Sequence, residues 1–224
     1  MGTDITLKAS DGHEFSAYLC EPGDDERGAI VVVQEIFGVN AHIRDISERF
    51  SQLGYRTIAP ALYDRIERDF EGGYTAKDVE RGRDFKSAAN ENLEGVLADL
   101  IAAKDEVSRA GSVGITGFCW GGFITWLAAS RLDFQAASCY YGGGIIDFND
   151  EKPNCPTILH FGSQDQSIPM ADVERISSSH TDIIVHVYDA DHGFNCDMRD
   201  QFDPRAANIA GMRTFELFNQ HIAT

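Results

Sequence analysis

The fold of this chain is decided by the stretch Ser112-Val113-Gly114-Ile115-Thr116-Gly117-Phe118-Cys119-Trp120-Gly121-Gly122. Its first five residues have the short apolar pattern of a buried strand, and residues 122–129 have the pattern of a helix. The glycines beside Cys119 allow a sharp turn between the two, because a strained turn crowds the backbone and only a residue without a Cβ fits there. We therefore predict a strand, a tight turn with a cysteine at its tip, and a helix.

The pattern Gly117-x-Cys119-x-Gly121 is the G-x-S-x-G turn of α/β-hydrolases with cysteine in place of the nucleophilic serine. The positive end of the following helix favours a thiolate over a thiol. Cys119 is therefore the predicted nucleophile. The alternative is a small buried cysteine in an ordinary loop, which the flanking strand and helix disfavour.

The rest of the chain alternates between strand and helix patterns. Residues 4–20 alternate around an Asp11-Gly12 turn, as in an antiparallel hairpin, and residues 61–89 are polar and irregular. This order predicts an α/β-hydrolase fold, with a mostly parallel central sheet, helices on both faces and one domain over residues 1–224. The expected strands lie at 29–33, 55–59, 113–116, 136–140, 156–161 and 183–188, and the expected helices at 41–53, 93–101, 169–178 and 204–219.

Composition excludes several classes of partner. The formal net charge of −17 would repel nucleic acids and anionic membranes, so we expect neither, and we expect a monomer that acts on a small molecule. The apolar runs are too short to cross a bilayer and the N-terminus lacks a signal-peptide pattern, so we expect a cytoplasmic protein.

The five cysteines are an odd number without C-x-x-C spacing, which argues against a disulfide framework and against a structural zinc site. The sequence also contains no phosphate-binding loop. We therefore expect no metal and no organic cofactor.

An acid and a base follow the cysteine in the order that this fold requires. Asp165 follows the strand at 157–161, and His192 follows the strand at 183–188. His192 would take the thiol proton, and Asp165 would orient the imidazole and stabilise its charged form. An aspartate in that place can also be a turn former, and a histidine can be structural, but the order of the three residues favours a triad.

Two backbone N–H groups are expected to form an oxyanion hole, one from Trp120 and one from Ile36 in the loop after an early strand. Beside the second lies Glu35, a carboxylate at the end of a buried strand. Because a buried charge is costly unless it is partnered, Glu35 is a further candidate functional residue.

Four segments together resemble the dienelactone hydrolase family, the carboxymethylenebutenolidases, over nearly the whole chain. They are Gln34-Glu35-Ile36-Phe37-Gly38-Val39, Gly117-Phe118-Cys119-Trp120-Gly121-Gly122, Gly162-Ser163-Gln164-Asp165 and Asp191-His192-Gly193-Phe194. The resemblance implies a triad of Cys119, His192 and Asp165, with Glu35 holding the cysteine at rest and helping to deprotonate it when substrate enters.

The resemblance also implies that arginines hold the carboxylate of the substrate. Arg81 occupies one such position, with Phe85 where the family often has tyrosine, although Arg81 could also be a surface arginine of a helix. The chain departs from dienelactone-specific members after the base, where it has Cys196 in place of an arginine, and Arg199 is the nearest alternative.

The expected activity is hydrolysis of a small lactone or ester, with dienelactone giving maleylacetate in the breakdown of aromatic compounds. An esterase or thioesterase acting on another small substrate is a second reading. A third is a thiol-based redox or ligand-sensing protein, which would need Cys119 but neither Asp165 nor His192.

Overall fold

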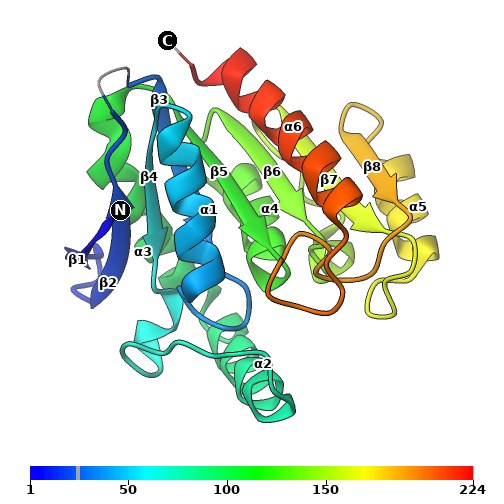
Figure 1. Ribbon diagram of the computed structural model, residues 1–224, viewed down its shortest axis with the longest axis horizontal. Helices are drawn as coiled ribbons and strands as arrows, with labels where there is room; N and C mark the ends of the chain where they lie inside the picture. The colour runs from blue at the N-terminus through cyan, green and yellow to red at the C-terminus, as the bar shows by residue number, and fades with distance from the viewer. Residues whose placement is uncertain (24–25, 224) are drawn as a thin grey trace. The chain divides into compact units, whose positions relative to one another are not determined.

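A computed structural model describes residues 1–23 and 26–223 of the chain (Figure 1). The chain forms two compact units, Met1–Val113 and Gly114–Ala223, and each is described by itself. The expectation of one domain over residues 1–224 stays a prediction, and it includes residues 24–25 and 224, which lie outside the described residues.

The strands of the first unit are β1 (Thr3–Lys8), β2 (Glu14–Cys20), β3 (Gly28–Val33) and β4 (Tyr55–Pro60), which lie in the order β1-β2-β4-β3. β2 runs antiparallel to both β1 and β4, and β3 runs parallel to β4. The predicted hairpin is confirmed. Every residue of β3 and β4 is buried, including the polar side chains of Arg56 and Thr57 in β4.

The helices of the first unit are α1 (Ala41–Gln52), α2 (Ala76–Asn90) and α3 (Leu93–Val107), with short 3₁₀ turns η1 (Leu62–Arg65) and η2 (Ser108–Ala110). The Asn40 side chain accepts the N–H of Ile43 and so caps α1. Helices α1 and α3 cover opposite faces of β3 and β4 (Figure 1).

The prediction of an irregular segment over residues 61–89 is wrong, because α2 occupies its second half. A capping box starts the helix, in which the hydroxyl of Thr75 accepts the N–H of Asp78 and the Asp78 carboxylate accepts the N–H of Thr75. Only Gly82 and Ala89 of α2 are buried. A helix that is exposed on most sides needs no stripe of apolar residues. Its sequence therefore lacks the apolar periodicity from which a helix is predicted.

The second unit contains the parallel strands β5 (Val113–Phe118), β6 (Ala136–Tyr140), β7 (Thr157–Gly162) and β8 (Ile184–Tyr188), which neighbour one another in chain order. Its helices are α4 (Trp120–Arg131), α5 (Met170–Ser179) and α6 (Pro204–His221), with a 3₁₀ turn η3 (Ile145–Phe148). The strands and α-helices match the expected elements to within two residues, and the 3₁₀ turn was not expected. Helices α4 and α6 lie on opposite faces of this unit's strands (Figure 1).

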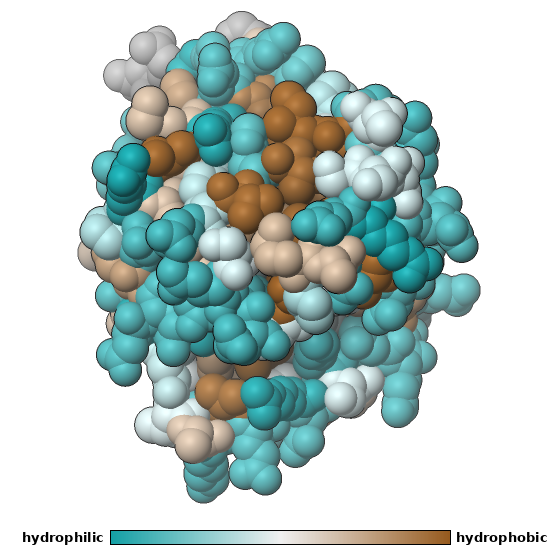
Figure 2. Space-filling view, turned by 90° about the vertical axis from the view of Figure 1, so that its right-hand side faces the viewer, coloured by the Kyte–Doolittle hydropathy of each residue, from teal (hydrophilic) through white to brown (hydrophobic). Residues whose placement is uncertain are grey.

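Helix α4 is the buried centre of the second unit. Its residues from Trp120 to Ala129 are all buried, and a helix that is apolar on every side belongs inside a core. The outer strand β8 is more accessible, and Figure 2 shows its side of the molecule as largely hydrophilic with an apolar patch near the middle. Among the residues that the structure describes, no helix has the length and hydrophobicity to span a bilayer.

Candidate active site

The cysteine of the tight turn lies where the sequence predicts it. β5 ends at Phe118, α4 begins at Trp120, and Cys119 between them has φ 55° and ψ −118°, a left-handed conformation that costs free energy in any residue but glycine. A Cβ on Gly117 would lie 2.2 Å from the carbonyl oxygen of Gly121, so only glycine fits there. The strand, turn and helix are confirmed.

The backbone of β6 holds this turn in place. The N–H of Cys119 donates to the carbonyl of Tyr140 at 3.0 Å, and the Cys119 carbonyl accepts the N–H of Gly122 at 3.0 Å. The Cys119 side chain is half-buried at the positive end of α4. The thiol is therefore fixed in direction and still accessible.

The structure brings Cys119, His192 and Asp165 together. His192 Nε2 lies 3.1 Å from Cys119 Sγ, and His192 Nδ1 lies 2.6 Å from Asp165 Oδ2. The other carboxylate oxygen of Asp165 accepts the backbone N–H groups of Ser167 at 2.7 Å and Ile168 at 3.2 Å. The segments that follow β5, β7 and β8 thus supply a continuous chain from carboxylate through imidazole to sulfur.

The charges around His192 favour its protonated form. Burial alone lowers the pKa of His192, but the negative charge of Cys119 and the hydrogen bond to Asp165 outweigh it and raise that pKa from 6.5 to about 10. The raised pKa therefore favours the imidazolium form of the ring. An imidazolium beside a cysteine is an arrangement that activates the sulfur as a nucleophile.

The neighbouring acids have other roles. Asp191 accepts the backbone N–H of His192 at 2.6 Å and so supports the main chain of the base. Asp189 accepts from the side chain of Gln164 at 2.7 Å. Neither bonds the imidazole, which agrees with the choice of Asp165. His160 is a buried histidine with Tyr188 and Thr214 on its two ring nitrogens.

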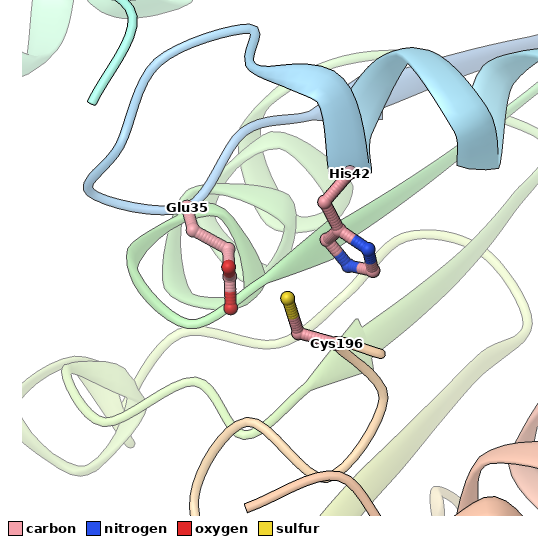
Figure 3. Close-up of side chains that lie close together, drawn as sticks. All are labelled: Glu35, His42 and Cys196. Atoms are coloured by element: carbon pink, nitrogen blue, oxygen red, sulfur yellow. The ribbon is translucent and has the colours of Figure 1, made fainter. Parts of the chain in front are cut away.

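Glu35 lies in the first unit, two residues beyond β3, and its side chain is buried. Figure 3 shows its carboxylate facing the ring of His42 in the first turn of α1, and a carboxylate oxygen and a ring nitrogen of the two lie within 4.8 Å. Sequence reasoning missed His42. Its signal is its position four residues before Ile46, on the buried face of α1. Ile36, the other candidate of this loop, is also buried.

The candidate substrate-binding residues lie in different units. In the first, Arg81 on α2 is half-exposed, pairs with Glu67, and has its guanidinium 5.3 Å from the centre of the Phe85 ring. In the second, Arg199 lies over Gly193, where an added Cβ would be 2.4 Å from Arg199 Nη1. Arg199 is thus beside the backbone that carries His192.

Comparison with known proteins identifies the family. The chain matches the dienelactone hydrolase family over residues 15–222. A protein of Synechocystis sp. named "Putative carboxymethylenebutenolidase" is 37% identical over 229 residues, which cover 93% of this chain and 93% of that protein. A protein of the same name from Escherichia coli K12 is 37% identical over 240 residues, which cover 97% of this chain and 86% of that protein.

A solved structure agrees with these relatives. The crystal structure of a "Putative Dienelactone Hydrolase" from Klebsiella pneumoniae matches with a TM-score of 0.82 at 31% identity, over 98% of this chain and 100% of that one. The match in sequence and in fold therefore extends over nearly the whole chain. The chain belongs to the dienelactone hydrolase family, has the α/β-hydrolase fold and is a hydrolase that acts on esters.

Proposed function

We propose that this protein hydrolyses a small lactone or ester through a triad of Cys119, His192 and Asp165. The observation that carries the proposal is the hydrogen-bonded chain from Asp165 Oδ2 through His192 to Cys119 Sγ, with steps of 2.6 and 3.1 Å. Nucleophile, base and orienting acid within hydrogen-bond reach of one another are the signature of covalent catalysis.

In the first half of the reaction, the Cys119 thiolate attacks the carbonyl carbon and forms a C–S bond, and the carbonyl electron pair moves to oxygen. We assign the N–H groups of Trp120 and Ile36 as donors to that oxyanion, on the strength of the sequence pattern. The oxyanion then collapses and breaks the C–O bond. The His192 imidazolium gives its proton to the departing oxygen, which leaves a thioester on Cys119.

In the second half, the neutral His192 takes a proton from water as the water oxygen attacks the thioester. The C–S bond breaks, the acid product leaves, and the imidazolium–thiolate pair is restored. Asp165 accepts from Nδ1 of His192 and stabilises the imidazolium. No step needs a metal or an organic cofactor.

Dienelactone, giving maleylacetate, is the substrate that we favour, because the family and the relatives named above point to it. An anionic substrate must approach a chain of net charge −17, which repels it. Salt screens this repulsion beyond about 8–10 Å, so a positively charged side chain close to the substrate is needed to bind its carboxylate. We assign this role to Arg199, beside the base loop, and to Arg81, with Phe85 shaping the site. Glu35 would gate the thiol.

The test is hydrolysis of cis- and trans-dienelactone and of a neutral short-chain ester by the wild type and by Cys119→Ala. Cys155→Ala is the matched control, because Cys155 is the other half-buried cysteine of the described chain and lies outside the triad. Turnover that requires Cys119 but not Cys155 supports the proposal. Turnover that survives in Cys119→Ala refutes it. A preference for the neutral ester would replace dienelactone with another small ester or thioester.

A thiol sensor is the second candidate, favoured by the raised pKa of His192, because a thiolate is also the form that oxidants attack. Such a protein does not need a base. If His192→Ala kept the biological activity, hydrolysis would be the wrong function. We also propose a reducing, cytoplasmic location, in which unbridged cysteines are the rule. The family points to a role in the breakdown of aromatic compounds.

A further inference from the structure

We propose that Tyr141 is a positioning residue for the triad, whose ring holds the imidazole of His192 while the peptide that precedes it holds Cys119. Its effect on turnover rests on the proposed function. Its effect on the reactivity of the thiol does not, so the two can be tested apart.

The backbone of Tyr141 is held in a conformation that tyrosine seldom adopts. Its φ is 38°, in the left-handed region, although three glycines follow it directly at 142–144. The residue is fully buried, and its N–H donates to the carbonyl of His160 at 2.7 Å. A bulky side chain kept at a strained position implies that the side chain is needed there, and such residues cluster at functional sites.

The ring of Tyr141 packs against the base. Its centroid lies 5.0 Å from that of His192 at an interplanar angle of 56°, and 5.2 Å from that of Phe194, two residues further along the same loop. An aromatic ring within about 6 Å of a cation attracts it. The contact therefore fixes the direction of the imidazole and favours its charged form.

Other charged or titratable groups in the second unit also face His192. Cys119 and Asp165 bond its two ring nitrogens, Asp191 bonds its N–H, and Arg199 lies over the adjacent Gly193. Two of these favour the imidazolium directly through hydrogen bonds to the ring. Tyr141 differs from them because it acts through its aromatic ring, which is tilted by 56° to the imidazole.

The preceding residue, Tyr140, contacts the nucleophile. Its carbonyl accepts the N–H of Cys119 at 3.0 Å, and its ring lies 4.6 Å from that of Phe118. A Cβ on Gly122 would lie 2.3 Å from the same carbonyl, so the turn is pressed against this peptide. One dipeptide thus contacts both the cysteine and the histidine of the triad.

A buried hydroxyl on α6 fixes that dipeptide. Thr214 Oγ1 lies 2.7 Å from the Tyr140 hydroxyl, 2.8 Å from Ser138 Oγ and 3.2 Å from His160 Nε2. A threonine hydroxyl has one donor and two acceptor sites, so these three partners saturate it. Because Ser138 and Tyr140 are on β6 and His160 is on β7, Thr214 links α6 to both strands beneath the triad.

The test is the pH profile of alkylation of Cys119 by iodoacetamide, read from the mass of its peptide. At pH values below about 8.5, the ordinary pKa of a thiol, the rate reports the imidazolium–thiolate pair. We expect Tyr141→Leu to lower this rate between about 2-fold and about 30-fold, the range of cation–π attraction. Tyr141→Phe keeps the ring and should match the wild type.

Phe148→Leu is the matched control, because Phe148 packs on Phe123, away from the triad, and its loss should leave the profile unchanged. Tyr141→Leu with an unchanged profile would overturn the proposal. If that variant does not fold, Tyr141→Met serves instead, because methionine fills the site without an aromatic ring, and it should lower the rate over the same range; a wild-type profile would again overturn the proposal. If the wild type hydrolyses no ester while the expected shifts appear, the proposed function fails and the positioning role stands.

Discussion

Replacing Asp165 by asparagine tests how much of the site depends on one carboxylate. The asparagine side chain would keep the shape of the aspartate and an oxygen for the N–H groups of Ser167 and Ile168, so the loop should hold. What the substitution removes is the negative charge 2.6 Å from His192 Nδ1. The substitution therefore tests the effect of the Asp165 charge while the shape of the site is kept.

The size of the effect follows from the pKa of His192. Its rise from 6.5 to about 10 corresponds to about 5 kcal/mol in favour of the imidazolium. A hydrogen bond to a charged group contributes about 1.5–3 kcal/mol of this, so Asp165→Asn should lower the pKa of His192 by about 1–2 units. The amide can also donate to Nδ1 and select the wrong tautomer, so kcat should fall by about 10²–10⁴.

NMR titration of the His192 ring measures the pKa, and steady-state hydrolysis measures kcat. We expect both quantities to fall in Asp165→Asn while the midpoint of thermal unfolding stays close to that of the wild type. Asp189→Asn is the matched control, because Asp189 bonds Gln164 and not the imidazole. An Asp165→Asn protein in which the His192 pKa and kcat are both unchanged would show that the Asp165 charge does not stabilise the imidazolium.

Four further predictions concern packing, pH, substrate and metal. Gly117→Ala should lower the free energy of unfolding, measured with urea, by about 1–3 kcal/mol, because the new Cβ would lie 2.2 Å from the Gly121 carbonyl oxygen. Gly211→Ala is the control and should leave that free energy unchanged, because no atom lies within 4 Å of its new Cβ. Equal losses in the two variants would contradict this prediction. Because folding raises the pKa of His192 from 6.5 to about 10, the protonation of His192 stabilises the folded protein fully below pH 6.5, and this stabilisation is lost as the pH rises towards 10. The free energy of unfolding of the wild type, measured against pH, should show this loss, and that of His192→Gln should not. Arg199→Ala should raise KM for dienelactone about tenfold and leave KM for a neutral ester unchanged. Equal changes in the two KM values would show that Arg199 does not bind the substrate carboxylate. EDTA should leave activity unchanged, and a loss that added metal reverses would show a metal requirement.

The tight turn could be predicted from the sequence because each of its parts is local. An apolar strand, two glycines around Cys119 and an apolar helix follow one another within a few residues, and each is determined by short-range sterics and burial. Asp165 and His192 could be chosen because parallel strands bring their following loops to one edge of a sheet. The chain order of the three residues then left few alternatives.

The remainder depends on contacts between distant residues. Helix α2 was missed because its sides are exposed and its one clear signal is the capping box at Thr75. His42 shares the buried face of α1, but no sequence pattern places it beside Glu35, and none places Tyr141 beside His192; both contacts depend on packing within each unit. The left-handed backbone of Tyr141 is likewise imposed by its surroundings rather than by its residue type.

The thioester on Cys119 can be detected by mass spectrometry of the Cys119 peptide, after the enzyme has been mixed with an excess of ester substrate and rapidly quenched with acid. We expect the mass of the acyl group to be added to Cys119 and to none of the other four cysteines. Turnover without any acyl group on Cys119, or an equal yield of adduct at Cys155, would contradict it.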